Sequence, residues 1–291
     1  MELSERNNIS IAQIVFFVPY LVVAILLCNR HSWGHSAGWL FLVIFSIARL
    51  LGASLQLATA ANPTNLSLYF GALTLQSIGL SNLTVTLLGL IARALKSISK
   101  ARSPVINPRI LFYAQLLVLV GVILAIVGGT ESSSTYADTG VYNVSPLAQA
   151  GVALTIAGFA LLVIATAVAG LHVASAEPGE KRLVLAVALS LPFFFVRVLY
   201  TAIGTYNPHS AFSTLTGSVN VFLGTAVIEE LIIMFIVEAI GLTLQIQPKN
   251  ADPNSSEPSF FGLWVKRVKG RYGGYEMQNR NSGRLYDASS V

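Results

Sequence analysis

Five charged side chains lie inside long apolar stretches of the sequence. They are Arg49, Arg197, Glu229, Glu230 and Glu238. A charge at the centre of a bilayer costs about 2.5–3.5 kcal/mol even on lenient insertion scales, so such residues usually face a bundle interior or an aqueous cavity. Two guanidiniums and three carboxylates together predict either buried ion pairs or a polar chamber that binds or moves a ligand.

Three of these charges are expected at one depth of the membrane. With a helical rise of about 1.5 Å per residue, Arg49 lies about 18 Å from the basic end of its run. Arg197 and Glu230 each lie about 21 Å from the same side by the same rise. Helical periodicity turns Glu229 away from Glu230, and we expect Glu230 to be the acid that faces inward.

Polar neighbours on the same helical faces complete the candidate site. The periodicity of about 100° per residue places Gln56 with Arg49, and Tyr200 beside Arg197. It also aligns Asn220 with Glu238 in the last run. The candidate ligand-binding set is Arg49, Gln56, Gln76, Asn82, Arg197, Tyr200, Glu230 and Glu238.

Three interpretations of this set remain open. The first is a functional chamber inside the bundle. The second is a structural lock of ion pairs and interhelical hydrogen bonds, which contribute only about 0.6 kcal/mol each on average in membranes. In the third, one or more of the charges lie near a lipid headgroup.

The elements that must position these residues are seven apolar runs, each long enough to cross a bilayer. The chain has 291 residues, of which 54% are hydrophobic and 11% charged, against about 25% charged in a soluble domain. Mean hydropathy is +0.68. We expect an all-α polytopic membrane protein, a bundle of seven transmembrane helices at Ile9–Cys28, Ala37–Ala58, Leu68–Ala92, Arg109–Gly129, Leu147–His172, Leu183–Gly204 and Ser218–Leu244.

The distribution of Lys and Arg predicts the orientation, because basic loops resist translocation. Fifteen basic residues fall in the first, third and fifth loops and the tail, whereas the other side has Arg6 alone. We therefore expect a short N-terminus (1–8) outside or in the lumen, a membrane domain (9–244) and a cytosolic tail (245–291). The pattern predicts a multi-pass protein and does not distinguish the plasma membrane from endomembranes.

The tail is rich in Asn, Ser, Gly and Pro, a composition typical of disorder. Its segment FFGLWVKRVKGRY, from Phe260 to Tyr272, interleaves aromatic and basic residues. Basic residues next to a membrane gain about 1 kcal/mol each from anionic lipids. We expect this tail to bind an anionic lipid surface, or to be a loose soluble tail, and we expect no nucleic-acid partner.

The sequence offers little support for cofactor, metal or enzyme chemistry. It contains no H-E-x-x-H, Walker A or G-x-G-x-x-G motif. His31 and His35 have i, i+4 spacing but no third ligand nearby, and the last run has no lysine for a retinal Schiff base. We expect no cofactor and no metal. An intramembrane cyclase or lyase that uses Glu230 as a proton donor remains a minority interpretation.

The charged runs resemble an uncharacterised family of seven-helix integral membrane proteins from filamentous fungi. The resemblance is carried by IARLLGASLQL around Arg49, LPFFFVRVLYTAIG around Arg197, and VIEELIIMFIVEAIG with Glu230 and Glu238. The family implies the seven-helix fold but transfers no activity. Arg197-Val-Leu-Tyr200 is also faintly similar to a basic stretch of fungal lipid-translocating exporters, although Thr201 and Gly204 stand where that family has charges.

These observations favour a receptor-like or transporter-like bundle that binds a small amphipathic molecule or lipid in a polar chamber at mid-membrane. Membrane lipids are the other expected partners. The alternatives are an intramembrane enzyme that uses a buried Glu, and a non-catalytic membrane scaffold.

Overall fold

The structure, a computed structural model, describes residues 4–31, 37–101, 108–208, 210–213 and 217–244. The chain divides into two units, Met1–Gln247 and Pro248–Val291. The second unit, and with it the predicted lipid-binding tail segment, lies outside the described residues. Of the two histidines with i, i+4 spacing only His31 is described, because His35 is also outside these residues.

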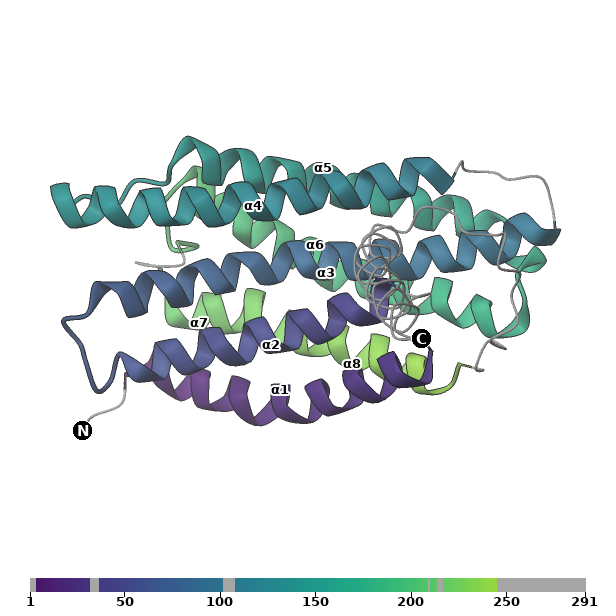
Figure 1. Cartoon of the computed structure of the whole chain (residues 1–291), viewed down its shortest axis with the longest axis horizontal. Coiled ribbons are helices and arrows are strands. Elements are labelled where there is room, and N and C mark those ends of the chain that lie inside the picture. Colours follow the sequence, from purple (N-terminus) through teal and green to yellow (C-terminus); the bar gives the residue numbers. More distant parts are fainter. Residues whose placement is uncertain (1–3, 32–36, 102–107, 209, 214–216, 245–291) are drawn as a thin grey trace, which may run out of the picture. The chain divides into compact units, whose positions relative to one another are not determined.

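The first unit is built of helices, and its described residues include no strand (Figure 1). The helices are α1 (Glu5–Arg30), α2 (Ala37–Ala58), α3 (Leu66–Ala101), α4 (Pro108–Thr139), α5 (Pro146–Leu171), α6 (Pro178–Tyr206), α7 (Val219–Phe222) and α8 (Ile228–Leu242). A short 3₁₀ turn, Val173–Ser175, precedes α6. A π-helix, Leu223–Val227, joins α7 to α8.

Seven of these segments are long and apolar enough to cross a membrane, with α7, the π-helix and α8 counting as one span, Val219–Leu242. The predicted fold class is therefore confirmed. Helices α1, α3, α4 and α6 are longer than predicted, and the largest extensions are those of α3 to Ala101 and of α4 to Thr139. Both extensions are polar, and a hydropathy window detects only the part of a helix that suits the hydrocarbon core.

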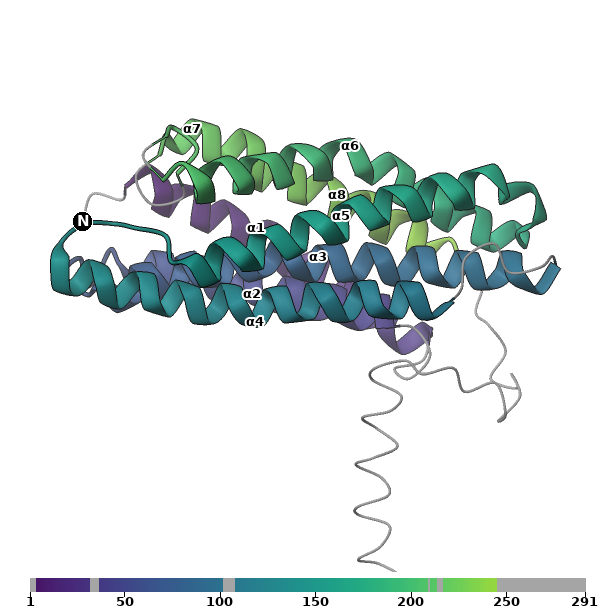
Figure 2. The same cartoon turned by 90° about the horizontal axis from the view of Figure 1, so that it is seen from above.

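Helix α3 lies at the centre of the bundle, where it packs against α2, α4, α5 and α6 (Figures 1 and 2). It has the lowest mean hydropathy of the seven spans and the largest buried share. Its Ser81 hydroxyl lies 3.0 Å from the hydroxyl of Thr155 on α5, and Arg93 donates two hydrogen bonds to Glu180 on α6, at 2.8 and 3.0 Å. Because lipid is as apolar as leucine, the more polar helix is the one that other helices cover.

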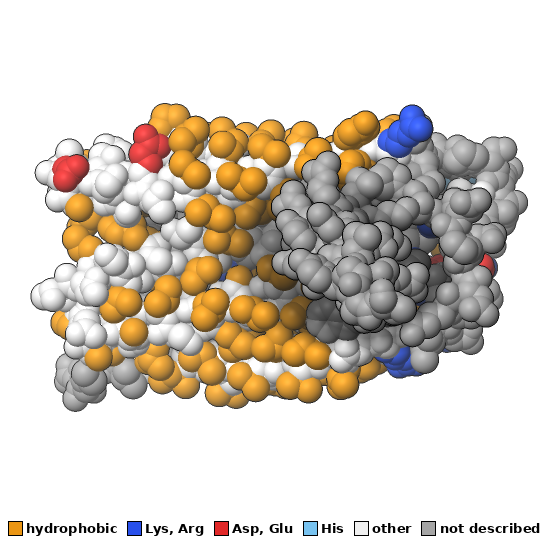
Figure 3. All heavy atoms as spheres, in the orientation of Figure 1, with side chains coloured by type: hydrophobic (Ala, Val, Ile, Leu, Met, Phe, Trp, Pro, Cys, Tyr) orange, Lys and Arg blue, Asp and Glu red, His pale blue; other side chains and the backbone are white. Residues whose placement is uncertain are grey.

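The outer surface of the bundle has the reverse composition. On the face in Figure 3, hydrophobic side chains cover the middle of the molecule and charged side chains lie toward its two ends. Large apolar residues of α4, such as Val120, Ile123 and Val127, are exposed. In water such a surface would aggregate, and in a bilayer it is the ordinary lipid-facing surface.

Helices α4 and α5 approach each other closely. A Cβ atom built at Gly151 of α5 would lie 2.7 Å from the carbonyl oxygen of Gly121 on α4. One built at Gly128 would overlap the backbone of Ala148. Small residues let helix backbones approach in this way without an intervening side chain.

Candidate functional site

Arg49, Arg197 and Glu230 meet inside the bundle, from α2, α6 and α8. Arg197 Nε donates to Glu230 Oε1 at 2.7 Å, and Arg49 Nη2 donates to the same oxygen. Each of the three residues is at most 3% exposed. The expected pairing is thus confirmed, and so is the choice of Glu230, since Glu229 is only half-buried and its Oε2 has no partner. We call these three residues the charge layer.

Polar and aromatic groups hold the two guanidiniums in place. Arg49 Nη1 donates to Gln76 Oε1 on α3, and Arg197 Nη1 donates to Thr201 Oγ1 at 2.5 Å. The Arg49 guanidinium carbon lies 5.3 Å from the Phe45 ring centre, a distance at which cation–π attraction acts. The guanidinium carbon of Arg197 lies 5.5 Å from the ring centre of Tyr200. Each guanidinium therefore has a hydrogen-bonding side chain and an aromatic ring as partners.

Gly79 of α3 makes room for the charge layer. A Cβ atom built at this position would overlap the guanidinium of Arg49. Gly79 is buried, so the guanidinium occupies the space that a side chain would fill in an ordinary helix contact. Here the small residue makes room for a charged side chain, not for the backbone of a neighbouring helix.

The π-helix changes the register of the last span just before the charge layer. A π turn holds more residues than an α turn, so residues on either side of it are rotated relative to a continuous α-helix. Asn220, before the π-helix, is exposed, whereas Glu238, after it, is 3% exposed. The alignment predicted for these two residues was therefore wrong, because it assumed unbroken α-helical periodicity.

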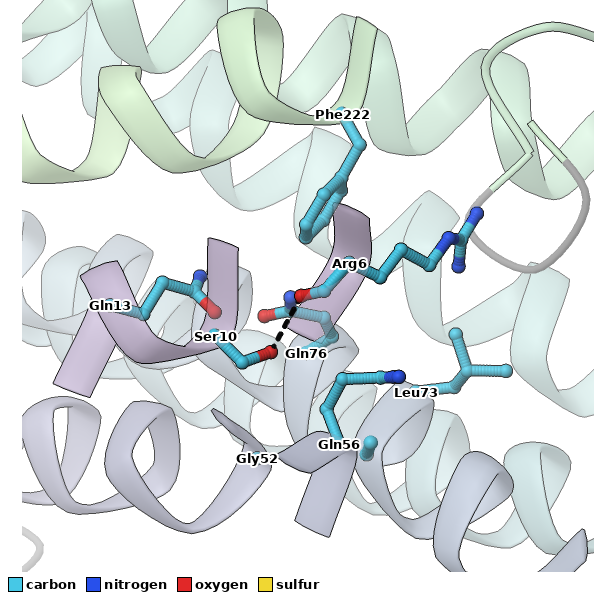
Figure 4. A pocket seen from close by; sticks show the side chains of 9 residues that line it. Arg6, Ser10, Gln13, Gly52, Gln56, Leu73, Gln76 and Phe222 are labelled. Carbon is cyan, nitrogen blue, oxygen red and sulfur yellow. Dashed lines mark hydrogen bonds between the residues drawn. The ribbon is translucent and has the colours of Figure 1, made fainter. Parts of the chain in front are cut away.

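A small cavity lies beside the charge layer, between α1, α2, α3 and α7 (Figure 4). Its volume is about 30 Å³, which is room for roughly two water molecules at about 10–15 Å³ each. The lining residues are Arg6, Ser10, Gln13, Gly52, Gln56, Ala72, Leu73, Gln76 and Phe222. We call this space the polar cavity.

Two residues connect the polar cavity to the charge layer. Gln76 lines the cavity and accepts the hydrogen bond from Arg49. Phe222 also lines the cavity, and its ring centre lies 6.3 Å from that of Tyr200, the ring under Arg197. A group that enters the cavity would therefore touch Gln76, which bonds Arg49 directly, and Phe222, which reaches Arg197 only through Tyr200.

The residues from α1 were missing from the expected site. Arg6, Ser10 and Gln13 follow each other at i, i+4 and i+7, so they share one helical face. This polar stripe at the start of the first run was the available signal. Gln13 is 3% exposed, and its Nε2 has no hydrogen-bond partner. The Ser10 hydroxyl donates to the Arg6 carbonyl at 3.0 Å, and Arg6 Nη2 donates to Gly217 O at 3.2 Å.

The other expected site residues lie apart from the cavity, except Gln56. Gln56 lines it and donates weakly to Asn7 Oδ1 and to Thr59 Oγ1, at 3.3 and 3.4 Å. Asn82 is buried on α3 with its Nδ2 unpartnered, and it does not line the cavity. Glu238 is buried with its Oε1 unpartnered, two turns beyond Glu230. A ligand-binding role stays a prediction for all eight residues.

His31, just beyond the end of α1, is buried among aromatic and apolar groups. Its Nδ1 lies 3.1 Å from the Leu27 carbonyl oxygen, and its ring stacks on Trp39 at 5.3 Å. Burial lowers the pKa of His31, the Leu27 hydrogen bond offsets part of this effect, and the nearby Arg93 and Arg30 lower it further. Among the described residues, no group of three His, Cys, Asp or Glu side chains could hold a metal ion.

Residues 3–247 match the family described as "Domain of unknown function (DUF7702)". None of the curated proteins and none of the solved structures matches the chain. The family match covers the whole seven-helix region. Fungal origin and the likeness to lipid-translocating exporters stay predictions.

Proposed function

We propose that this chain, which belongs to the DUF7702 family, is a receptor-like or transporter-like membrane protein that binds a small amphipathic molecule. In this proposal the polar end of the ligand enters the polar cavity, and its apolar part lies against Phe222 and Leu73. The seven-span fold supplies the membrane setting. Because the cavity holds only about two water-sized groups, the rest of the ligand must lie outside it.

The observation that carries the proposal is the double role of Gln76. This side chain lines the cavity and at the same time bonds Arg49, which shares Glu230 with Arg197. A ligand that contacts Gln76 would bias a hydrogen-bonded network that joins α2, α3, α6 and α8. A ligand shifts a conformational equilibrium only if it interacts more favourably with one conformation than with the other.

The enzyme alternative fits the geometry less well. A general acid must reach its substrate, but Glu230 Oε1 already accepts hydrogen bonds from two buried guanidiniums. The scaffold alternative is a stronger rival, since a charge layer needs no ligand to stabilise a bundle. Ligand binding at the cavity separates this alternative from our proposal.

Thermal stability of the purified protein in phosphatidylcholine nanodiscs tests the proposal, with decanoate, decanol and decylammonium as probes. We expect at least one probe to raise the unfolding temperature of the wild type and to lose most of its effect on Gln13→Leu. Gln149→Leu, the same change on α5 outside the cavity, is the matched control and should respond like the wild type. If no probe stabilises the wild type more than it stabilises Gln13→Leu, the scaffold interpretation replaces ours.

A further inference from the structure

Two amide NH₂ groups of residues that line the cavity are available as hydrogen-bond donors. Arginine has only donors, so the Gln76 amide must turn its oxygen toward Arg49, which leaves its NH₂ group for the cavity. Gln13 Nε2 is buried and has no partner. The Ser10 hydroxyl donates to the Arg6 carbonyl, and Gln56 Nε2 donates to Asn7 and Thr59, so the oxygens of Ser10 and Gln56 remain as acceptors. An acceptor would satisfy both amides, which otherwise carry the cost of an unmade hydrogen bond.

The charge layer next to these donors is positive. Two guanidiniums share one carboxylate, and arginine stays protonated in proteins. Of the described acids on α8, Glu229 is half-buried and turned away, and Glu238 lies eight residues, or about 12 Å, further along the helix. In a medium of low dielectric constant an excess positive charge attracts an anion far more strongly than it would in water.

We propose that the polar cavity binds the carboxylate of an amphipathic acid, with the amide groups of Gln13 and Gln76 donating to its two oxygens. This inference rests on the proposed function and names the head group of its ligand. A carboxylate is small enough for a volume of about 30 Å³, whereas a sugar or a phosphodiester would need the helices to separate. An alkyl ammonium would meet donors and a like charge.

Head-group selectivity tests the inference, by titration of the wild-type protein in phosphatidylcholine nanodiscs with empty nanodiscs subtracted. Decanoate and decanol share the chain and differ in charge, so we titrate both under alkaline conditions in which decanoate is ionised. We expect decanoate to bind at least about tenfold more tightly than decanol, the effect of one charge-assisted hydrogen bond. Gln13→Leu should lose this preference, and Gln149→Leu should keep it.

The remaining outcomes separate the inference from the proposed function. Equal affinity for decanol and decanoate, lost together in Gln13→Leu, would overturn the carboxylate and leave the binding function in place. Absence of binding by decanoate, decanol and decylammonium alike would overturn both. Acetate distinguishes the source of the head group, because competition by acetate at the affinity of decanoate supports the carboxylate but makes the ligand a free small acid.

Discussion

Where α2, α6 and α8 meet, three charged side chains fill the space between the helices, whereas between α4 and α5 hardly any side chain intervenes. In the first region Arg49 and Arg197 share the carboxylate of Glu230. In the second, a Cβ atom at Gly151 would lie 2.7 Å from one backbone atom of α4 and 2.8 Å from another. The first contact depends on charge, and the second depends on a missing Cβ.

The two contacts also differ in how far apart their residues lie along the chain. α4 and α5 follow each other directly through a short turn, Gly140–Ser145, so their pairing is local. Arg49 and Glu230 are 181 residues apart. Interhelical polar contacts and close packing of small residues both hold helices together in lipid. We infer that the charge layer specifies which remote helices come together.

Removal of the shared carboxylate should have the largest effect. Glu230→Gln leaves two buried guanidiniums without a counter-charge, and breaking a buried pair costs about 3–5 kcal/mol. We expect a large fall in the unfolding temperature of the purified protein. Glu229→Gln, the neighbouring acid outside the layer, is the control and should leave that temperature nearly unchanged. Equal losses from both variants would contradict the assignment of Glu230.

A methyl group in the α4–α5 contact should have the next largest effect. Gly151→Ala forces two backbones apart, and overpacking of this kind costs about 1–3 kcal/mol. Gly170→Ala, on the same helix with no atom within 4 Å of the added carbon, should be neutral or slightly stabilising. Thermal unfolding of the two variants side by side checks the expectation, and a loss in Gly170→Ala alone would refute it.

A double-mutant cycle at Gly79 and Arg49 sharpens the contrast between the two kinds of glycine. Gly79→Ala alone should destabilise the protein because its methyl group overlaps the Arg49 guanidinium. In an Arg49→Gln background the same change should cost less, with a coupling of about 1 kcal/mol. Additive losses would mean that Gly79, like Gly151, allows a close approach of helix backbones and does not make room for Arg49. Folding stability of the four proteins gives the coupling directly.

The smallest expected effect is a pH dependence at His31, away from both contacts. The pKa of His31 is lowered in the folded protein. In the unfolded chain the pKa is about 6.5. As pH falls, the unfolded chain therefore binds a proton at this residue before the folded protein does. Stability is then fully present above that value and declines below it. His31→Gln should flatten this decline in a series of unfolding temperatures against pH. An identical decline in the variant would assign it to another group.

Most of the fold could be predicted from the sequence, and only part of the site. The seven spans follow from hydropathy because the cost of placing a residue in lipid is a property of that residue and its near neighbours. The pairing of Arg49 and Arg197 with an acid was predictable from depth alone. Gln13 was missed because the polar stripe that it forms with Arg6 and Ser10 shows a shared helical face but not that this face lines a cavity.

The amino-acid sequence by itself determined that the chain has seven segments long and apolar enough to cross a membrane, and that Arg49, Arg197 and Glu230 can meet at one level. Tertiary structure alone decided three other features: the polar cavity, the room that Gly79 leaves for Arg49, and the π-helix that rotates Asn220 away from Glu238. The physical reason is that insertion into lipid is decided locally along the chain. Empty space, close contact and helical register depend on how helices remote in sequence pack together.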